Sequence, residues 1–143
     1  MRIEKLYPMT SARLTLIDSG APLRIAAQAL SRPGIGLAVV GDRNGRAAGV
    51  LSKSDLIRHL TEQEQPTTVE TLMSREIIFC SPADDLQAAW QAMVEKRLQN
   101  MPVLGSDARP LGILDIRDVL KVLFEQEQLQ EHMLANYIAG IGY

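Results

Sequence analysis

An internal repeat constrains the fold of this chain more than any other feature of its sequence. When the sequence is shifted by 63 residues, residues 13–60 align with residues 76–123 without a gap. Two copies of one supersecondary unit therefore occupy nearly the whole chain of 143 residues. Most apolar positions stay apolar in both copies, and identical pairs include Gly49 and Gly112, Leu51 and Leu114, and Asp55 and Asp118.

The pattern of apolar and polar residues predicts the same elements in each copy, in the order strand, helix, strand, strand, helix. A short extended run opens each copy, and a helix with an apolar stripe follows it. A hairpin comes next, for which the Asn44-Gly45 pair is a strong turn signal in the first copy. The expected strands are residues 13–17, 35–40 and 47–51 in the first copy, and residues 76–80, 98–104 and 111–114 in the second.

Polar residues mark where the helices are expected to begin. Ser81-Pro82-Ala83-Asp84 has the pattern of a capping box with proline at the first helical position, so it predicts that a helix starts there. In the first copy, Asp18 or Ser19 can cap the equivalent helix. The expected apolar stripes are Leu23, Ala26, Ala27 and Leu30 in the first copy, and Leu86, Ala89, Trp90, Met93 and Val94 in the second.

The segments that flank the copies are polar or helical. Residues 61–68 are polar and contain Pro66, which is typical of a linker, and residues 69–73 suggest a helical turn. Residues 118–138 predict a long helix with one solvated face. The last residues, 137–143, are unusually apolar for a free terminus, so we expect them to dock on another surface.

Composition limits the class of protein. With 46% hydrophobic and 22% charged residues, the chain can form a globular core. Its net charge is −2 and its basic residues are scattered, which disfavours nucleic-acid binding. Cys80 is the single cysteine, so an internal disulfide is impossible, and it is expected to be a small buried hydrophobe in a reducing compartment. Because no apolar run approaches membrane-spanning length and no signal segment opens the chain, we expect a soluble, cytoplasmic protein.

No pattern of residues predicts catalysis or metal binding. His59 and His132 stand alone in helical stretches, where they are poor candidates for metal ligands. Asp84 and Asp85 fall in the first turn of an expected helix, where carboxylates favour capping over acid–base work. The sequence contains no Walker A loop, no GxGxxG motif and no supported nucleophile–base arrangement. We therefore expect a protein that is not an enzyme and requires no cofactor.

Four short motifs make the chain resemble a known family. Two of them, Gly49-Val-Leu-Ser-Lys-Ser-Asp55 and Gly112-Ile-Leu-Asp-Ile-Arg-Asp118, precede the last helix of each copy. With Met101-Pro102-Val103 and Val69-x-x-Leu-Met73, they resemble the CBS domain, named after cystathionine β-synthase, of which a tandem pair is called a Bateman module. The resemblance covers roughly residues 3–124, and the apolar tail is similar to that of small stand-alone bacterial CBS proteins.

The resemblance implies an α/β (α+β) fold. Two strand-helix-strand-strand-helix domains are expected to be related by a pseudo-two-fold axis, with their sheets packed together and two clefts between them. Such pairs usually form homodimers shaped like a flat disc. The implied limits are residues 1–60 for the first CBS domain, 61–68 for the linker, 69–124 for the second CBS domain and 125–143 for a C-terminal helical extension.

The resemblance also implies a regulatory role. The usual ligands of the family are AMP, ADP and ATP, with S-adenosylmethionine in some members, and they act as regulatory ligands. The expected partners are therefore a nucleotide, a second copy of the chain as a homodimer, and an unidentified protein target, but neither nucleic acid nor membrane. Alternatively, a CBS pair that has lost its ligand serves as a dimerisation or protein-interaction module.

The resemblance assigns ligand contacts to the motif residues. Asp55 and Asp118 are assigned to the ribose, because a carboxylate can accept two hydrogen bonds from a vicinal diol. The residue three positions earlier stands at a helix start, where free N–H groups can hold a phosphate. Adenine is expected between aliphatic side chains of the strands. The implied ligand-binding residues are Thr15, Ala38, Ser52, Lys53, Ser54, Asp55, Ile78, Met101, Pro102, Asp115, Arg117 and Asp118.

The same motifs also have a purely structural interpretation. Ser52–Asp55 and Asp115–Asp118 are both plausible capping boxes, which would explain their local form without a ligand. From local sequence alone this interpretation is the simpler one. Within the repeat the two are compatible, because a cap orients groups that a ligand can then use.

The two clefts are not expected to be equivalent. Ser52 has Lys53 and Ser54 beside it, which is a favourable environment for phosphate. Asp115 stands in the equivalent position of the second copy and would repel a phosphate unless Arg117 offsets its charge. We therefore expect the cleft that uses Asp55 to bind an adenine nucleotide more tightly than the cleft that uses Asp118.

Overall fold

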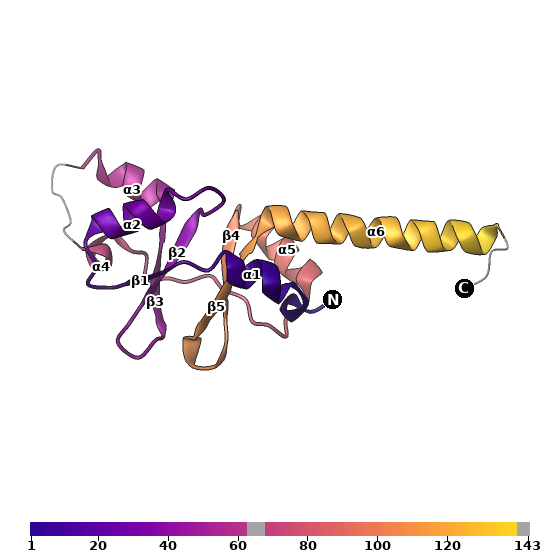
Figure 1. Ribbon diagram of the computed structural model, residues 1–143, viewed down its shortest axis with the longest axis horizontal. Coiled ribbons are helices and arrows are strands. Elements are labelled where there is room, and N and C mark those ends of the chain that lie inside the picture. The colour runs from indigo at the N-terminus through magenta and orange to yellow at the C-terminus, as the bar shows by residue number, and fades with distance from the viewer. Residues whose placement is uncertain (63–67, 140–143) are drawn as a thin grey trace.

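A computed structural model describes residues 1–62 and 68–139 and shows two lobes, one for each copy of the repeat (Figure 1). The strands are β1 (Leu16–Asp18), β2 (Leu37–Gly41), β3 (Ala47–Ser52), β4 (Asn100–Leu104) and β5 (Pro110–Asp115). In the first lobe, β2 lies between a parallel β1 and an antiparallel β3. In the second lobe, β4 and β5 are antiparallel. The mixed α/β fold expected from the sequence is confirmed.

Helices cover both sheets and lead into them. They are the 3-10 turn η1 (Ile3–Leu6), α1 (Tyr7–Ala12), α2 (Leu23–Leu30), α3 (Lys53–His59), α4 (Val69–Leu72), α5 (Leu86–Glu95), the 3-10 turn η2 (Ser106–Ala108) and α6 (Ile116–Ile138). The helical turn expected near residue 69 and the long C-terminal helix are confirmed. The sequence did not predict η1 and α1.

The first strand of the second copy departs from the repeat. The sequence predicts a strand over residues 76–80, but this segment forms only one isolated parallel bridge, between Cys80 and Val103. In the first copy, the N–H of Val39 donates to the carbonyl of Thr15 over 2.9 Å. The residue equivalent to Val39 is Pro102, which has no N–H to donate, so the second ladder is interrupted there.

Two predicted helix starts are wrong. Helix α5 begins at Leu86, with Asp85 as its N-cap and with the Asp85 carboxylate accepting from the N–H of Ala88 over 3.1 Å. The Asp84 carboxylate does accept from the N–H of Ser81 over 2.8 Å, but this contact closes a turn that precedes the helix.

In the first copy, α2 begins after Pro22, and no side chain caps it. The two expected caps lie too early in the chain, because Asp18 ends β1 and the N–H of Ser19 donates to Gly41 across the sheet over 3.2 Å.

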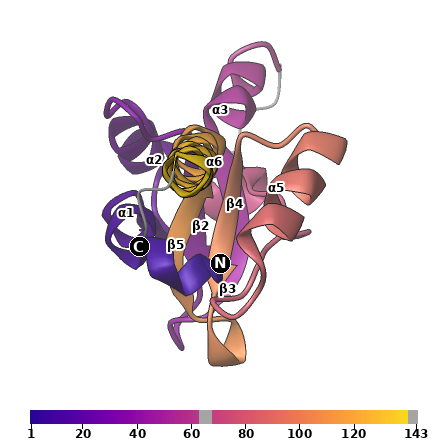
Figure 2. The ribbon, with the colours of Figure 1, turned by 90° about the vertical axis from the view of Figure 1, so that its right-hand side faces the viewer.

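The segments that lead into each copy are exchanged between the lobes. Figure 2 shows α1 beside β5, in the second lobe, although α1 precedes the first copy in sequence. Ile3 and Leu6 join the buried cluster of the second lobe. Conversely, Val69 and Met73 precede the second copy but join the cluster of the first lobe. The packing units therefore differ from the repeat units of the sequence.

Two repeat-related glycines permit this exchange. A Cβ atom at Gly112 would lie 2.7 Å from the backbone of Thr10 in α1. A Cβ atom at Gly49 would lie 2.6 Å from the sulfur of Met73 and 2.7 Å from the carbonyl oxygen of Ser74. Thr10 and Met73 are themselves equivalent under the 63-residue shift, so the same close approach occurs twice. Only a residue without a side chain fits there.

Aliphatic side chains fill both cores, largely as the helical stripes predict. Buried stripe residues are Ala26, Leu30, Leu86, Ala89 and Met93, whereas Ala27 and Val94 are exposed, contrary to prediction. The expectation that Cys80 is a buried hydrophobe is confirmed, since only 5% of it is exposed. Burial raises the pKa of its thiol to about 12, so the reactive thiolate is disfavoured.

Helix α6 projects past the second lobe (Figure 1). Its first turns pack against the core through Val119, and exposed apolar side chains follow along its length. The middle of the expected linker, residues 63–67, and the end of the apolar tail, residues 140–143, lie outside the described residues. Within residues 1–62 and 68–139, no helix is both long and apolar enough to cross a membrane.

Candidate functional site

Two cavities between the lobes are related by the internal repeat. One, called here the Ser52 pocket, has a volume of about 440 Å³ and is lined by Ser52, Lys53, Ser54 and Arg97 among others. The other, the Asp115 pocket, has a volume of about 340 Å³ and is lined by Asp115, Ile116, Arg117 and Gly34 among others. Shifting the sequence by 63 residues converts nearly all of one lining into the other.

The two pockets share a wall formed by Gly36, Lys53, Gln99 and Asn100. Both volumes lie at the lower end of the range found for small-molecule sites. A larger groove of about 540 Å³ runs between α5 and α6, but all of its lining residues, which include Trp90 and Phe124, belong to the second lobe. The repeat-related pair is therefore where charged and polar groups from both lobes converge.

The predicted capping box at the start of α3 is present in the Ser52 pocket. Ser52 Oγ accepts from the N–H of Asp55 over 3.2 Å, and Asp55 Oδ2 accepts from the N–H of Ser52 over 2.9 Å. The N–H of Lys53 donates to the carbonyl of Gly36 over 3.4 Å. The backbone N–H groups of Ser52, Lys53 and Asp55 therefore already have partners within the chain, although the N–H groups of this helix start were expected to hold a phosphate.

Side chains provide the positive charge of the Ser52 pocket. Lys53 and Arg97 line it, and the lining that the described residues form contains no carboxylate. Arg97 adopts a left-handed backbone with φ of 55°, at the position equivalent to Gly34, whose φ is 81°. This conformation is costly for a residue with a side chain. The sequence did not single out Arg97, although its alignment with a glycine was a usable signal.

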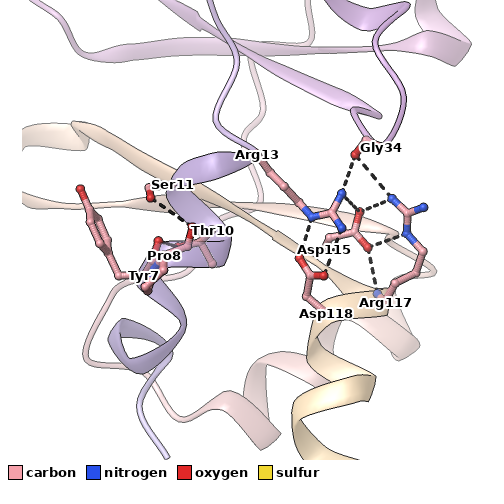
Figure 3. A network of polar contacts seen from close by, with 9 residues as sticks. All are labelled: Tyr7, Pro8, Thr10, Ser11, Arg13, Gly34, Asp115, Arg117 and Asp118. Atoms are coloured by element: carbon pink, nitrogen blue, oxygen red, sulfur yellow. Dashed lines mark hydrogen bonds and ion pairs between the residues drawn. The ribbon is translucent and has the colours of Figure 1, made fainter.

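The Asp115 pocket contains a network of charged groups (Figure 3). The side chain of Asp115 is 2% exposed. Its Oδ1 accepts from the backbone N–H and from Nε of Arg117, each over 2.9 Å, and its Oδ2 accepts from Arg117 Nη2 over 2.8 Å. Burial acts to raise the pKa of Asp115, but the hydrogen bonds from Arg117 and the charge of Arg13 outweigh it and hold that pKa below its ordinary value.

The second capping box is not formed, contrary to its expected role. Asp115 caps α6 through the N–H of Arg117, but the carboxylate of Asp118 turns to Arg13 instead. Arg13 Nε and Nη2 donate to its two oxygens over 2.6 and 3.0 Å. Arg13 Nη1 also donates to the carbonyl of Gly34 over 2.6 Å and lies 3.6 Å from Asp115 Oδ2. The hydrogen bond to Asp118 raises the pKa of Arg13.

The strand residues assigned to adenine lie away from both linings. Thr15 is buried, and its hydroxyl accepts from Arg32 Nη2 over 3.1 Å. Ala38 and Pro102 are buried within β2 and β4. Ile78 and Met101 line a separate cavity of about 280 Å³ beside α5. The structure thus gathers Ser52, Lys53 and Ser54 in one pocket and Asp115 and Arg117 in the other, while Asp55 and Asp118, which were assigned to the ribose, are in neither lining.

Two similar lobes with a pair of cavities between them define a tandem-domain protein whose sites lie where the repeats meet. The family model for the CBS domain matches residues 4–62 and again residues 69–125. The chain therefore belongs to the CBS-domain family, as a tandem pair. An uncharacterized 33.4 kDa protein of Thermofilum pendens is 31% identical over 108 residues, or 75% of this chain, and the chain spans only 35% of that protein.

Solved structures share the fold. The CBS domain pair of protein MJ0100, in complex with 5′-methylthioadenosine and S-adenosyl-L-methionine, is similar with a TM-score of 0.76 and 18% identity, over 88% of this chain and 98% of that chain. CBSX2, in complex with AMP, is similar with a TM-score of 0.75 and 18% identity, over 88% and 98% of the two chains. At this identity the likeness establishes the fold alone.

Proposed function

We propose that this chain is a regulatory, ligand-sensing CBS pair of the cytoplasm that binds an adenine nucleotide in the Ser52 pocket and has no enzymatic activity. The observation that carries the proposal is the pair of cations in this pocket, Lys53 and Arg97, with no carboxylate in the lining that the described residues form. The complexes of CBSX2 with AMP and of MJ0100 with two adenosyl compounds support the adenosine part of the ligand.

The charges of the pocket favour a ligand that carries phosphate. Lys53 and Arg97 attract the phosphate, and the Ser54 hydroxyl adds a donor. S-adenosylmethionine has no phosphate and carries a sulfonium cation, so we expect it to bind this pocket more weakly than AMP, ADP or ATP.

Asp55 is proposed to hold the ribose hydroxyls. Its Oδ2 caps α3, and its Oδ1 contacts Arg58, whose side chain is 66% exposed. Ion pairs with such exposed side chains contribute little, so a ribose hydroxyl can replace Arg58 at small cost.

Thermal-shift measurements with AMP, ADP, ATP, S-adenosylmethionine and NADH test the proposal. A ligand that binds only the folded chain raises its Tm, and we expect the phosphate-bearing nucleotides to do so. Lys53→Met should abolish the shift, whereas Lys121→Met, which removes an exposed lysine of α6, should leave it unchanged. No shift with any compound at millimolar concentration would instead favour the dimerisation or protein-interaction module.

We also propose that the chain forms a homodimer through its helices. Ile57 of α3 and Leu120 of α6 are equivalent in the repeat, and they are 64% and 48% exposed. Other exposed apolar side chains continue along α6, namely Phe124, Leu129, Met133, Leu134 and Ile138. Sedimentation should find a dimer for the wild type and a monomer for Phe124→Glu. A wild-type monomer at micromolar concentration would contradict this proposal.

A further inference from the structure

Arg13 connects the two lobes through its contacts with Asp118 and Gly34. It follows α1 and precedes β1, whereas its partners Asp115 and Asp118 belong to the second copy. We propose that the Arg13 guanidinium binds the Asp118 carboxylate in place of a ligand, so that the chain binds one nucleotide and not two. This inference rests on the proposed function, because it concerns how many of the two motif aspartates are available to a nucleotide.

The contacts of Arg13 make it a strong competitor. Its guanidinium holds both oxygens of Asp118, over 2.6 and 3.0 Å, and donates a third bond to the carbonyl of Gly34 over 2.6 Å. The side chains of Arg13 and Asp118 are only 24% and 17% exposed, so water screens the pair incompletely. A ribose diol would have to replace two bonds from a charged donor with bonds from neutral hydroxyls, which are weaker.

The first copy has no comparable competitor. The residue equivalent to Arg13 is Glu76, which carries the same charge as Asp55 and cannot pair with it. Asp55 instead contacts Arg58 from its own helix, and that side chain is exposed. Because arginine stands at position 13 and glutamate at the equivalent position 76, the Asp118 carboxylate has a charged partner from outside its helix and the Asp55 carboxylate does not.

The charges lead to the same conclusion. Arg13 and Arg117 are matched by Asp115 and Asp118, so this network is neutral as a whole. The remaining cation in the lining of the Asp115 pocket is Lys53, which also lines the Ser52 pocket. Its repeat equivalent is the uncharged Ile116.

Calorimetric titration of the full chain with AMP tests the inference. We expect one AMP per chain for the wild type and two for Arg13→Met, because the substitution frees Asp118. The double variant Arg13→Met with Asp118→Asn should return to one. Arg24→Met, which removes an exposed arginine of α2, serves as the matched control and should behave as the wild type.

Each outcome decides between the alternatives. Two AMP molecules per wild-type chain, or one per chain in folded Arg13→Met, would overturn the inference. Binding by Arg13→Met alone would support the block by Arg13 while refuting the Ser52 pocket as the wild-type site. Binding by neither protein would refute the proposed function and the inference together.

If Arg13→Met does not fold, Asp118→Asn provides the decision. It should leave AMP affinity within about twofold of the wild type, because Asp118 contacts Arg13 and not the ligand. A loss of tenfold or more would overturn the inference.

Discussion

The starts of α3 and α6 occupy equivalent places in the repeat but use their motif aspartates differently. At α3, Ser52 and Asp55 close a capping box within one segment of the chain. At α6, Asp115 caps the helix alone, and Asp118 reaches Arg13, which lies 105 residues away in sequence. The comparison teaches that a repeated motif sets the position of a carboxylate, while residues from elsewhere in the chain determine which group that carboxylate binds.

The strongest test of the paired architecture is to fill the glycine positions. Gly112→Ala should lower the free energy of unfolding by about 3 kcal/mol, because its Cβ would meet the backbone of Thr10, which cannot turn aside. Gly49→Ala should cost about 2 kcal/mol, because part of its obstacle is the flexible Met73 side chain. Urea unfolding measures both, with Gly20→Ala as control, because a Cβ atom at Gly20 would meet no atom within 4 Å beyond its chain neighbours. Equal stabilities of all three variants would contradict the exchanged packing.

Removing the buried carboxylate of the second copy should have the next largest effect. Asp115→Ala leaves Arg117 and Arg13 without this acceptor, and we expect a loss of about 2 kcal/mol at pH 7. The loss stays moderate because Arg117 is 65% exposed and can turn to water. Urea unfolding of Asp115→Ala measures this loss. Asp42→Ala, which removes a carboxylate from an exposed turn, is the control. A loss no larger than that of Asp42→Ala would count against the network.

Low pH should erase the difference between Asp115→Ala and the wild type. The pKa of Asp115 is lower in the folded chain than its ordinary value of 3.8, so its contribution is complete above that value and is lost as the pH falls through the folded pKa. The difference in stability between the two proteins should therefore shrink as the pH falls below 3.8. Repeating the urea unfolding in steps from neutral to acidic pH gives the curve. A constant difference would show that the carboxylate acts without its charge.

Ligand titrations sharpen the comparison of the two aspartates. Asp55→Ala should weaken AMP binding by about tenfold or more, because it removes the proposed ribose acceptor, which corresponds to about 1.4 kcal/mol. Asp118→Ala should change the affinity by less than about twofold. Isothermal titration of both variants measures the ranking, and equal losses in the two would contradict it.

The smallest effect is expected at the cap of α3. Ser52→Ala removes the hydroxyl that accepts from the N–H of Asp55 and should cost about 1 kcal/mol of stability. Ser54→Ala is the matched control, since Ser54 lies two residues after Ser52, within α3, and does not cap the helix. Thermal unfolding distinguishes the two, and a Ser54→Ala loss as large as that of Ser52→Ala would argue against the cap.

Local patterns predicted much of the fold. Short apolar runs separated by turn residues located β2, β3, β4 and β5 within a few residues, and Ser52 with Asp55 marked the start of α3. These features depend on contacts between near neighbours in sequence, which a single sequence displays directly. Helix α5 was misplaced because two aspartates compete as caps and the turn at Ser81 uses the first.

Contacts between distant segments were beyond the sequence. Nothing in residues 3–12 indicates that they pack in the second lobe, because their apolar side chains fit either core. Arg13 has no local signal, since its partners come from the far end of the chain. Burial of Thr15 and Ala38 likewise depends on which face of the sheet the helices cover.

By itself, the sequence determined that the chain is a pair of similar α/β units in which most apolar positions stay apolar in both copies. It determined this because a gapless repeat forces the same order of strands and helices twice. Only the tertiary structure decided that the lead-in helices are exchanged and that Arg13 closes over Asp118. The physical reason is that burial and ion pairing depend on which side chains meet in space, and the exchange brings together residues that the repeat keeps far apart.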